Sequence, residues 1–337
     1  MTGMKGEAST HRLLFVCYPD TNHPIGGVKQ IYRHVELLHQ AGWQAFVLHE
    51  AEGFRVDWFE SQAPVLGLQS YLASSPDSST DSLVLPETWV GNIPGYFPGI
   101  PKIVFNQNGY YTFGLDANIN ANILDLYRHA DVQGVVTVSE DNRRFLVEGC
   151  GLESGAVQVV LNGIDGDIFY PPERKLRKIV YLGRKQLQHA RIVRAMAERR
   201  SFFSRYPFVE LGRLSHGQIA AELREALVFL STGHPEGFGL PLAEAIASGC
   251  LVVGYHGLAG RDFCWPALVE VPYGDLLAFV NTLEHAIRTF EEEPEVSTQR
   301  LVHQAVELRQ RYSLERERQR CLEVWSALIS QPTAVLG

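Results

Sequence analysis

The sequence predicts an α/β fold built from two doubly wound domains. Short apolar runs alternate with helically periodic segments along most of the chain, which is the pattern of a parallel sheet with helices on its faces. This alternation is interrupted once, near the paired prolines Pro171 and Pro172, and then begins again. The chain has 337 residues, enough for two domains of ordinary size that each bury a core.

The first domain is expected over residues 1–170. Its predicted strands are the apolar runs 13–17, 45–48, 83–85, 103–105, 134–138 and 157–161. Val28, Ile31, Val35 and Leu38 recur at helical spacing after the first run, and this helix should stop at Gly42. A helix between two strands makes a βαβ unit, which implies parallel pairing.

Three further features of this domain are predicted from composition and periodicity. A helix is expected near 119–129, where Ile119, Ile123, Leu124 and Tyr127 are spaced for one helical face. Ser139 is a suitable N-cap for a second helix that ends at Gly149. The Ser- and Asp-rich segment 69–82 is expected to be a surface loop.

The second domain is expected over residues 171–312. Its predicted strands are 179–182, 208–211, 227–230 and 251–253, with helices between them. A last helix near 314–329 follows the final strand. The carboxyl ends of the strands in such open sheets are where ligands bind.

Composition limits the classes of function. The formal net charge is −8, and the Arg clusters, 191–205 and 309–320, are short; the second is interleaved with Glu, so we expect no nucleic-acid partner. The N-terminal segment 1–11 lacks the apolar core of a signal peptide, and no run of about 18 apolar residues occurs. The cysteines are widely spaced and odd in number, so we expect free thiols in a reducing cytoplasm rather than disulfides or a zinc site; they are Cys17, Cys150, Cys250, Cys264 and Cys321.

The segment 227–249 carries the strongest chemical signal. An apolar strand leads into a glycine-rich loop, and Pro241 suits the first position of the helix that follows and ends at Gly249. A helix that starts after a glycine loop presents unpaired backbone N–H groups and a positive dipole end. Gly237 and Gly239 let the backbone approach a ligand closely. The segment therefore predicts a phosphate site.

Two carboxylates flank this loop: Glu236 precedes it, and Glu244 is expected in the first turn of the helix. A carboxylate repels phosphate, but it can accept hydrogen bonds from vicinal hydroxyls of a ribose or a hexose. Phosphate donors beside two hydroxyl acceptors describe a nucleotide-sugar site. The structural alternative is that Glu244 complements the helix dipole and Glu236 is a surface residue.

The segment EGFGLPLAEAIASGCLVVG resembles the E-x7-E motif of retaining glycosyltransferases with the GT-B fold, family 4 in particular. The resemblance implies that Glu236 contacts the donor sugar and that Glu244 holds the ribose hydroxyls. It also implies that backbone amides after Glu236 contact the diphosphate and sugar; these belong to Gly237, Phe238, Gly239 and Leu240.

The resemblance covers most of the chain. The segment 180–184 is similar to the family's first strand of the C-terminal domain, whose Arg, here Arg184, binds the diphosphate. Gly26 and Gly27 match the glycine loop that closes over donor phosphates, 138–140 matches a late N-domain motif, and 162–165 matches the interdomain junction. The implied fold is two Rossmann-like domains that face a central cleft, with a C-terminal helix, 313–337, packing back on the N-terminal domain.

The sequence departs from the family's pattern in the surroundings of the motif. The usual Lys about five residues after the Arg is absent, so Lys185, or else His189, would supply the second positive charge. Arg184 and Lys185 can both face phosphate only if the strand has already ended. The stretch 184–227 is short by one strand–helix unit, which affects the base pocket; Leu214 is the residue carried over there.

A second departure lies in the N-terminal domain. The family often has a His at a strand end near the donor sugar, where this chain has Gln107 and Asn108. Either amide can hydrogen-bond a sugar hydroxyl. The alternative is that these amides only cap the strand end.

The resemblance implies retaining transfer of a sugar from a nucleotide diphosphate sugar to an acceptor hydroxyl, in the synthesis of a surface glycan or glycoconjugate. Glu236, Arg184 and Lys185 would be the catalytic residues. No metal-ligand cluster is visible, so we expect neither a metal nor another cofactor. The acceptor would be a glycan or a lipid-linked sugar, handled in the cytoplasm or by peripheral contact with the inner face of the membrane.

Three other readings are weighed against transfer. A sugar-nucleotide epimerase or a phosphorylase can use the same architecture, because fold does not fix function. A non-catalytic partner that binds a nucleotide sugar or a glycan is the second. A dehydrogenase would need G-x-G-x-x-G after the first strand, and the segment 26–28 does not supply it.

Overall fold

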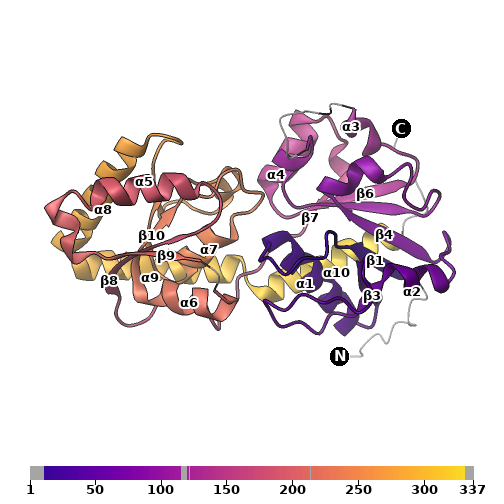
Figure 1. The fold of residues 1–337 in the computed structure, drawn as a ribbon, viewed down its shortest axis with the longest axis horizontal. Helices are drawn as coiled ribbons and strands as arrows, with labels where there is room; N and C mark the ends of the chain where they lie inside the picture. Colours follow the sequence, from indigo (N-terminus) through magenta and orange to yellow (C-terminus); the bar gives the residue numbers. More distant parts are fainter. Residues whose placement is uncertain (1–10, 115–119, 121, 213, 331–337) are drawn as a thin grey trace. The chain divides into compact units, whose positions relative to one another are not determined.

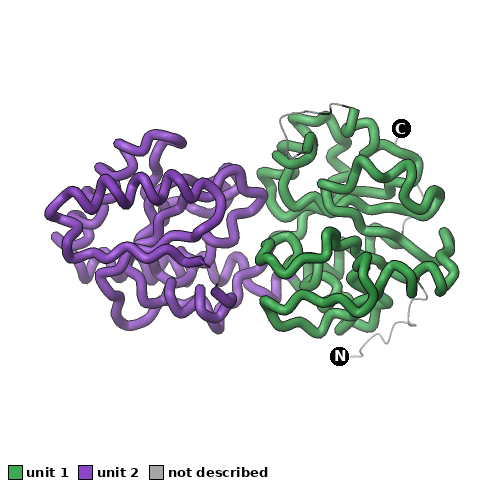
Figure 2. The backbone as a smooth tube through the Cα atoms, viewed as in Figure 1, with its two compact units in different colours: residues 1–161, 318–337 green, residues 162–317 purple. Residues whose placement is uncertain are grey.

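The computed structural model describes residues 11–114, 120, 122–212 and 214–330 of the chain. The chain divides into two compact units (Figure 2): unit 1 combines residues 1–161 with 318–337, and unit 2 comprises residues 162–317. Each unit contains one parallel sheet with helices packed on it (Figure 1). The predicted α/β fold with two parallel sheets is confirmed.

Unit 1 is built on a seven-stranded sheet in the order β3-β2-β1-β4-β5-β6-β7. Every pairing in it is parallel. Strands buried on both faces need apolar side chains throughout, which is why most of them were visible as continuous apolar runs. The strands are β1 (Arg12–Val16), β2 (Gln44–His49), β3 (Val65–Gly67), β4 (Asp81–Pro86), β5 (Lys102–Asn106), β6 (Val132–Thr137) and β7 (Val157–Val159).

Two helices of unit 1 have an end that matches a signal in the sequence. The first helix, α1 (Gly26–Gln40), ends just before Gly42, whose φ of 89° only glycine adopts readily. Ser139 caps α4 (Glu140–Arg144) by accepting a hydrogen bond from the amide of Asn142, and a π-helical turn, η3 (Phe145–Gly149), continues to the predicted end. Three short 3-10 turns complete the connections: η1 (Glu87–Asn92), η2 (Gly109–Tyr111) and η4 (Ser154–Ala156).

The prediction of a loop over 69–82 was wrong. A short helix, α2 (Leu68–Ala73), occupies its first part, and β4 begins at Asp81. Tyr71 explains the difference, because its ring is fully buried and its hydroxyl donates to the Asp81 carboxylate at 3.1 Å. This tertiary contact outweighs the low helix propensity of the serine-rich segment.

The helix predicted near 119–129 is much shorter in the structure. The described part, α3 (Ile123–Leu126), has four residues and continues into turns, while Ile119 lies outside the described residues. Tyr127 is buried as its spacing suggested, and its hydroxyl accepts a hydrogen bond from the Asn106 amide at 2.9 Å. The apolar spacing therefore identified an inward face but overestimated the helical length.

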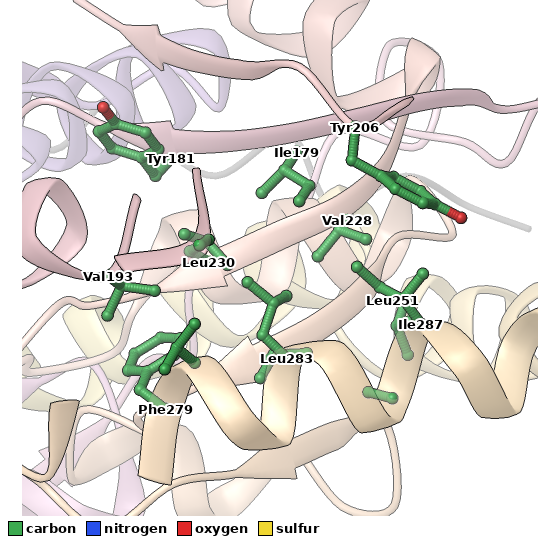
Figure 3. Packing of buried hydrophobic residues seen from close by; sticks show 14 of the residues in the cluster. Ile179, Tyr181, Val193, Tyr206, Val228, Leu230, Leu251, Phe279, Leu283 and Ile287 are labelled. Atoms are coloured by element: carbon green, nitrogen blue, oxygen red, sulfur yellow. The ribbon is translucent and has the colours of Figure 1, made fainter. Parts of the chain in front are cut away.

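Unit 2 is built on a five-stranded parallel sheet in the order β12-β11-β10-β8-β9. One face is covered by α8, whose Phe279, Leu283 and Ile287 pack against strand residues such as Val228 and Leu251 (Figure 3). The strands are β8 (Leu176–Leu182), β9 (Phe208–Leu211), β10 (Ala226–Ser231), β11 (Leu251–Gly254) and β12 (Leu268–Glu270). The helices are α5 (Leu187–Ala197), α6 (His216–Glu225), α7 (Leu240–Ala247), α8 (Leu276–Glu292) and α9 (Pro294–Arg311), with 3-10 turns η5 (Ser201–Arg205) and η6 (Ala259–Asp262).

The short stretch between β8 and β10 has a simple architecture. One helix, α5, and the turn η5 connect β8 to β9, which is the edge strand of the sheet. A second helix, α6, returns the chain to β10. Within the described part of this stretch no additional strand occurs, in line with the shortening noted in the sequence.

The last helix, α10 (Leu314–Ser330), anchors the end of the chain in unit 1. The Trp325 ring is fully buried there, 4.9 Å from the Phe15 ring, centroid to centroid. Its indole N–H donates to Nδ1 of His34 at 3.1 Å. Burial lowers the pKa of His34 to about 3, so this imidazole is neutral and its Nδ1 can accept.

Truncating Trp325 tests how much this anchor contributes. Trp325→Ala should lower the free energy of unfolding by about 3–5 kcal/mol, because it removes a buried aromatic side chain and leaves a cavity. Leu277→Ala on α8 is the control, since that side chain is 62% exposed and its loss should change stability by about 0.5 kcal/mol or less. Urea titrations followed by circular dichroism compare the two. Equal, small effects would show that the helix contributes little to unit 1.

Candidate functional site

The candidate site of unit 2 lies where three neighbouring strands end. In the sheet β8, β10 and β11 are adjacent and parallel, so their carboxyl ends lie side by side. The segments that follow them are the turn 183–186, the glycine-rich loop 232–239 and the segment 255–258. Sequence reasoning had placed most candidate residues in the first two of these segments.

The turn after β8 carries Arg184 and Lys185. Because β8 ends at Leu182, both residues lie beyond the strand, and the alternation of strand side chains does not separate them. The Lys185 ammonium donates to the Glu236 carboxylate at 2.9 Å and to the carbonyl of Pro235. Both charged side chains are about one-fifth exposed. The turn therefore places a cation directly beside the first carboxylate of the motif.

Two further hydrogen bonds join this turn to the glycine-rich loop. Thr232 donates its hydroxyl to the Lys185 carbonyl at 3.3 Å, and the Gln186 side-chain amide donates to the His234 carbonyl at 3.4 Å. Gln186 has a φ of 52°, a left-handed conformation that a residue with a side chain adopts at a cost. Such strain persists only where the surroundings over-determine it, which is common at functional sites.

The segment after β11 holds the other side of the loop. The Glu236 amide donates to the Gly257 carbonyl at 2.8 Å, so the residue that carries the carboxylate is fixed through its main chain. Gly257 has a φ of 68°, and a Cβ there would lie 2.8 Å from the Gly233 carbonyl oxygen. Leu258, which bridges to Glu236, also has a positive φ, of 78°. Only glycine at 257 allows the two segments to approach this closely.

The glycine-rich loop leads directly into α7. Gly239 occupies the N-cap position with a φ of 95°, and no side chain caps the helix. Pro241 is the second residue of the helix rather than the first, but its missing N–H is still one that the helix would leave unpaired. No acidic residue lies in the first turn. The start of α7 therefore presents backbone N–H groups and a positive dipole end, both suited to an anion.

Glu244 lies deeper in α7 than the sequence suggested. It was expected in the first helical turn, but it is the fifth residue of the helix, one turn further in. A dipole effect is largely confined to the first turn, so the purely structural explanation of Glu244 is weakened. The carboxylate is 8% exposed and pairs with Nε2 of His216 at 3.1 Å.

The remaining residues of unit 2 that the sequence assigns to binding of the sugar donor differ in which groups they expose. Arg184 is exposed, and its guanidinium forms no hydrogen bond or ion pair with the described part of the chain. Phe238 is 4% exposed, and its ring packs on Phe263 at 5.1 Å, so only its backbone is available. Gly237 and Gly239 are buried, while Leu240 and Leu214 are partly exposed.

His189, the alternative second cation, is engaged elsewhere in unit 2. It lies in the first turn of α5, and its Nδ1 is 3.1 Å from the Tyr255 hydroxyl. Its ring also lies beside Tyr273, at a centroid distance of 5.7 Å. Of the two candidates, Lys185 is the one that contacts Glu236.

Three of the unit 1 candidates, Gly26, Gly27 and Gln107, meet at the start of α1. Gly26 and Gly27 are its first two residues, and the Gln107 side-chain amide donates to the Gly27 carbonyl at 3.1 Å. Asn108 is 5% exposed, and its oxygen accepts from the Tyr110 amide at 3.2 Å. This hydrogen bond is the strand-end capping that was the alternative to a sugar contact.

His234, in the glycine-rich loop, is held toward its neutral form mainly by burial. The pKa of His234 is lowered by burial and by the nearby His256 and Lys185 charges. His234 is stacked on Tyr273 at a centroid distance of 4.0 Å.

In the described residues no group of three His, Cys, Asp or Glu side chains is arranged to hold a metal ion. No helix in the described ranges is long and apolar enough to cross a membrane.

Sequence reasoning missed two residues that shape this site, His216 and Gly257. Ser215 and Gln218 form a capping box, which predicts a helix that starts at His216. No sequence pattern near this helix indicates that it contacts Glu244. Gly257 is one of 30 glycines in the chain. Its importance depends on a contact with Gly233, far from it in sequence, so no local signal could have identified it.

Comparison with known proteins adds a sequence relative. No protein-family model matches the chain. The alpha-1,6-glucosyltransferase of Actinobacillus pleuropneumoniae serotype 7 is 26% identical over an alignment of 239 residues, which covers 66% of this chain and 67% of the relative.

Solved structures share the fold over almost the whole chain. The sucrose-phosphate synthase of Thermosynechococcus elongatus aligns with a TM-score of 0.67 at 16% identity, covering 95% of this chain and 99% of that one. The Anabaena protein HepE in complex with UDP-glucose aligns with a TM-score of 0.71 at 12% identity, covering 94% and 99%. Together the relative and the shared GT-B fold identify the chain as a glycosyltransferase enzyme.

The close approach at Gly257 leads to a prediction about stability. Gly257→Ala should destabilise unit 2 by about 1–3 kcal/mol, because the added methyl group meets the Gly233 carbonyl and φ is left-handed. Gly217→Ala is the matched control: its Cβ would meet nothing within 4 Å, and alanine is the better helix former, so stability should rise by about 0.4–1 kcal/mol. Thermal melts of both variants measure these two changes in stability. A harmless Gly257→Ala would show that the loop is not held as described.

Proposed function

We propose that this glycosyltransferase takes its sugar from a nucleotide diphosphate sugar bound at the carboxyl ends of β8, β10 and β11. The observation that carries the proposal is the Lys185–Glu236 pair next to the uncapped start of α7. It combines, in one unit, a cation and free amides for phosphate with a carboxylate for hydroxyls.

The diphosphate is the part of the donor that most needs stabilisation, because negative charge accumulates on it as the sugar leaves. Arg184 is exposed and unpaired in the described chain, so it can turn toward an anion without breaking an existing contact. The start of α7 adds backbone N–H groups that are already oriented. These groups and Lys185 can stabilise the leaving group without a metal ion, which is why we propose that none is required.

Glu236 is the group proposed to bind the donor sugar. Its amide is held by Gly257 and its carboxylate by Lys185, so its position is fixed before the donor arrives. Only one oxygen of the carboxylate is paired with Lys185, and a carboxylate can accept from several donors at once. Sugar hydroxyls can therefore join the arrangement without displacing the lysine.

The resemblance to family 4 supports retention of configuration. In the proposed reaction the acceptor hydroxyl attacks the anomeric carbon on the same face that the diphosphate leaves. A new bond forms between the acceptor oxygen and the anomeric carbon, the bond between that carbon and the β-phosphate oxygen breaks, and the acceptor proton passes to the departing phosphate. Glu236, Arg184 and Lys185 stabilise this step.

For the donor we propose UDP-glucose as the first compound to test. The Actinobacillus relative is an alpha-1,6-glucosyltransferase, and one structure with this fold holds UDP-glucose. For the acceptor we propose a glycan or a lipid-linked sugar in surface glycan synthesis, reached in the cytoplasm or at the inner face of the membrane.

A panel of nucleotide sugars tests the proposal directly. In buffer that contains EDTA, a donor present at about 100 times its Kd should stabilise the fold by about 2.7 kcal/mol, measured as a thermal shift. Turnover should then release the nucleoside diphosphate only when an acceptor is present. Release that depends on inorganic phosphate would indicate a phosphorylase, conversion to another nucleotide sugar would indicate an epimerase, and binding without turnover would indicate a non-catalytic partner.

Removing the Glu236 carboxylate should abolish transfer. Glu236→Ala is expected to lower kcat by about a hundred-fold or more, by analogy with the loss of one preorganised transition-state contact, while circular dichroism stays unchanged. Glu225→Ala is the control: that carboxylate is 57% exposed and pairs with Lys178 on the same unit. Unchanged turnover in Glu236→Ala would remove this site from the mechanism.

Arg184 should matter for chemistry more than for folding. Arg184→Ala is expected to lower kcat by about 10²–10³-fold, because it removes a charge that stabilises the leaving diphosphate. Arg191→Ala serves as the control, since Arg191 is also exposed but lies on α5 in an ion pair with Glu210. If steady-state assays gave the two variants the same kcat, Arg184 would not be the diphosphate ligand.

A further inference from the structure

The pair between His216 and Glu244 links two helices of unit 2. His216 is the first residue of α6, and Glu244 lies in the second turn of α7. Nε2 of His216 is 3.1 Å from Oε1 of the Glu244 carboxylate. The side chains are 24% and 11% exposed, so the contact is partly shielded from water and stronger than a surface pair.

His216 is held in place by one contact to its ring and by hydrogen bonds that fix the backbone beside it. The edge of Phe169 packs against it at a centroid distance of 5.0 Å and an interplanar angle of 68°. Its backbone is fixed by the capping box of α6, in which Ser215 and Gln218 each accept a hydrogen bond from the other's amide. An imidazole restrained in this way can keep the Glu244 carboxylate in one orientation.

The two oxygens of the Glu244 carboxylate differ in their surroundings. His216 engages Oε1, and because a carboxylate only accepts, Nε2 must carry the proton. The other oxygen, Oε2, accepts no hydrogen bond from the residues that the structure describes. One oxygen is therefore anchored by the protein while the other is left for a hydroxyl donor.

We propose that His216 is a positioning residue, which fixes the Glu244 carboxylate so that its second oxygen can receive the vicinal hydroxyls of the donor ribose. This inference rests on the proposed function, because it assumes that Glu244 binds the ribose. His216 itself does not touch the reacting atoms. It acts by keeping the carboxylate in one orientation, so that no ordering of the side chain is needed when the nucleotide binds.

The test compares two substitutions of His216 by calorimetry with UDP and with 2′,3′-dideoxy-UDP. His216→Phe keeps a ring beside Phe169 but removes the donor, while His216→Gln keeps an N–H donor. His216→Phe should weaken UDP binding about ten-fold, the loss expected for a hydrogen bond to a charged group, and hardly change binding of the dideoxy compound. His216→Gln should restore most of the preference for the ribose hydroxyls.

Kinetics add a second readout. With UDP-glucose as donor, His216→Phe should act mainly on KM, because the lost interaction is present in the ground state and the transition state alike. His303→Phe is the control, since His303 is 73% exposed on α9 and takes no part in the site.

The outcomes separate this inference from the proposed function. If His216→Phe melts at a lower temperature but still distinguishes UDP from the dideoxy compound as wild type does, the pair is only a tie between α6 and α7, and the inference is overturned. If wild type binds neither compound, or binds both equally, the ribose site itself is wrong. In that case both the proposed function at Glu244 and this inference fail.

Discussion

The hydrogen bonds that hold the Glu236 loop are the constraint on which the candidate site depends. The loop follows β10, the strand between β8 and β11, and it is hydrogen-bonded to the segments that follow both of those neighbours. This is a consequence of parallel topology, in which neighbouring strands deliver their carboxyl ends to one edge. The Gly257 contact then fixes Glu236, and Gly239 turns the chain into α7.

The charges at this edge of the unit 2 sheet contribute little to stability. The Lys185–Glu236 pair is partly exposed, and pairs of this kind contribute little net free energy to folding. What it does is place a cation and a carboxylate at a known separation beside free amides. Glu244 differs in being a largely buried carboxylate, and its partner His216 lies on another helix. In the proposed function, the phosphates and the hydroxyls of the donor would thus meet different groups within one unit.

The sequence predicted the long buried strands well because a central parallel strand must be apolar on both faces, as 226–231 and 251–254 are. It missed β3 and β12, which lie at the edges of their sheets and have three residues each. At such lengths the sequence pattern is a weak signal, although the equally short β7 was predicted from 157–161. It also missed α2, where burial of Tyr71 decides the conformation.

The site was predictable to the extent that its chemistry is local. The segment 236–244 contains two carboxylates, the glycines and the helix start, and each was identified from the residues alone. Contacts between distant segments were not. The Lys185–Glu236 pair spans 51 residues and the His216–Glu244 pair spans 28, and no periodicity or motif encodes either distance. The depth of Glu244 in α7 was also not predicted, because it depends on the residue at which the helix begins.

Hydrogen–deuterium exchange tests the central claim most directly, namely that a nucleotide sugar binds at the carboxyl ends of the unit 2 strands. On addition of UDP-glucose, or of whichever donor binds in its place, the account predicts slower exchange in peptides that cover 183–187 and 236–244. Exchange along α8, which packs on the sheet core, should be unaffected. A donor that binds without protecting either segment would contradict the account.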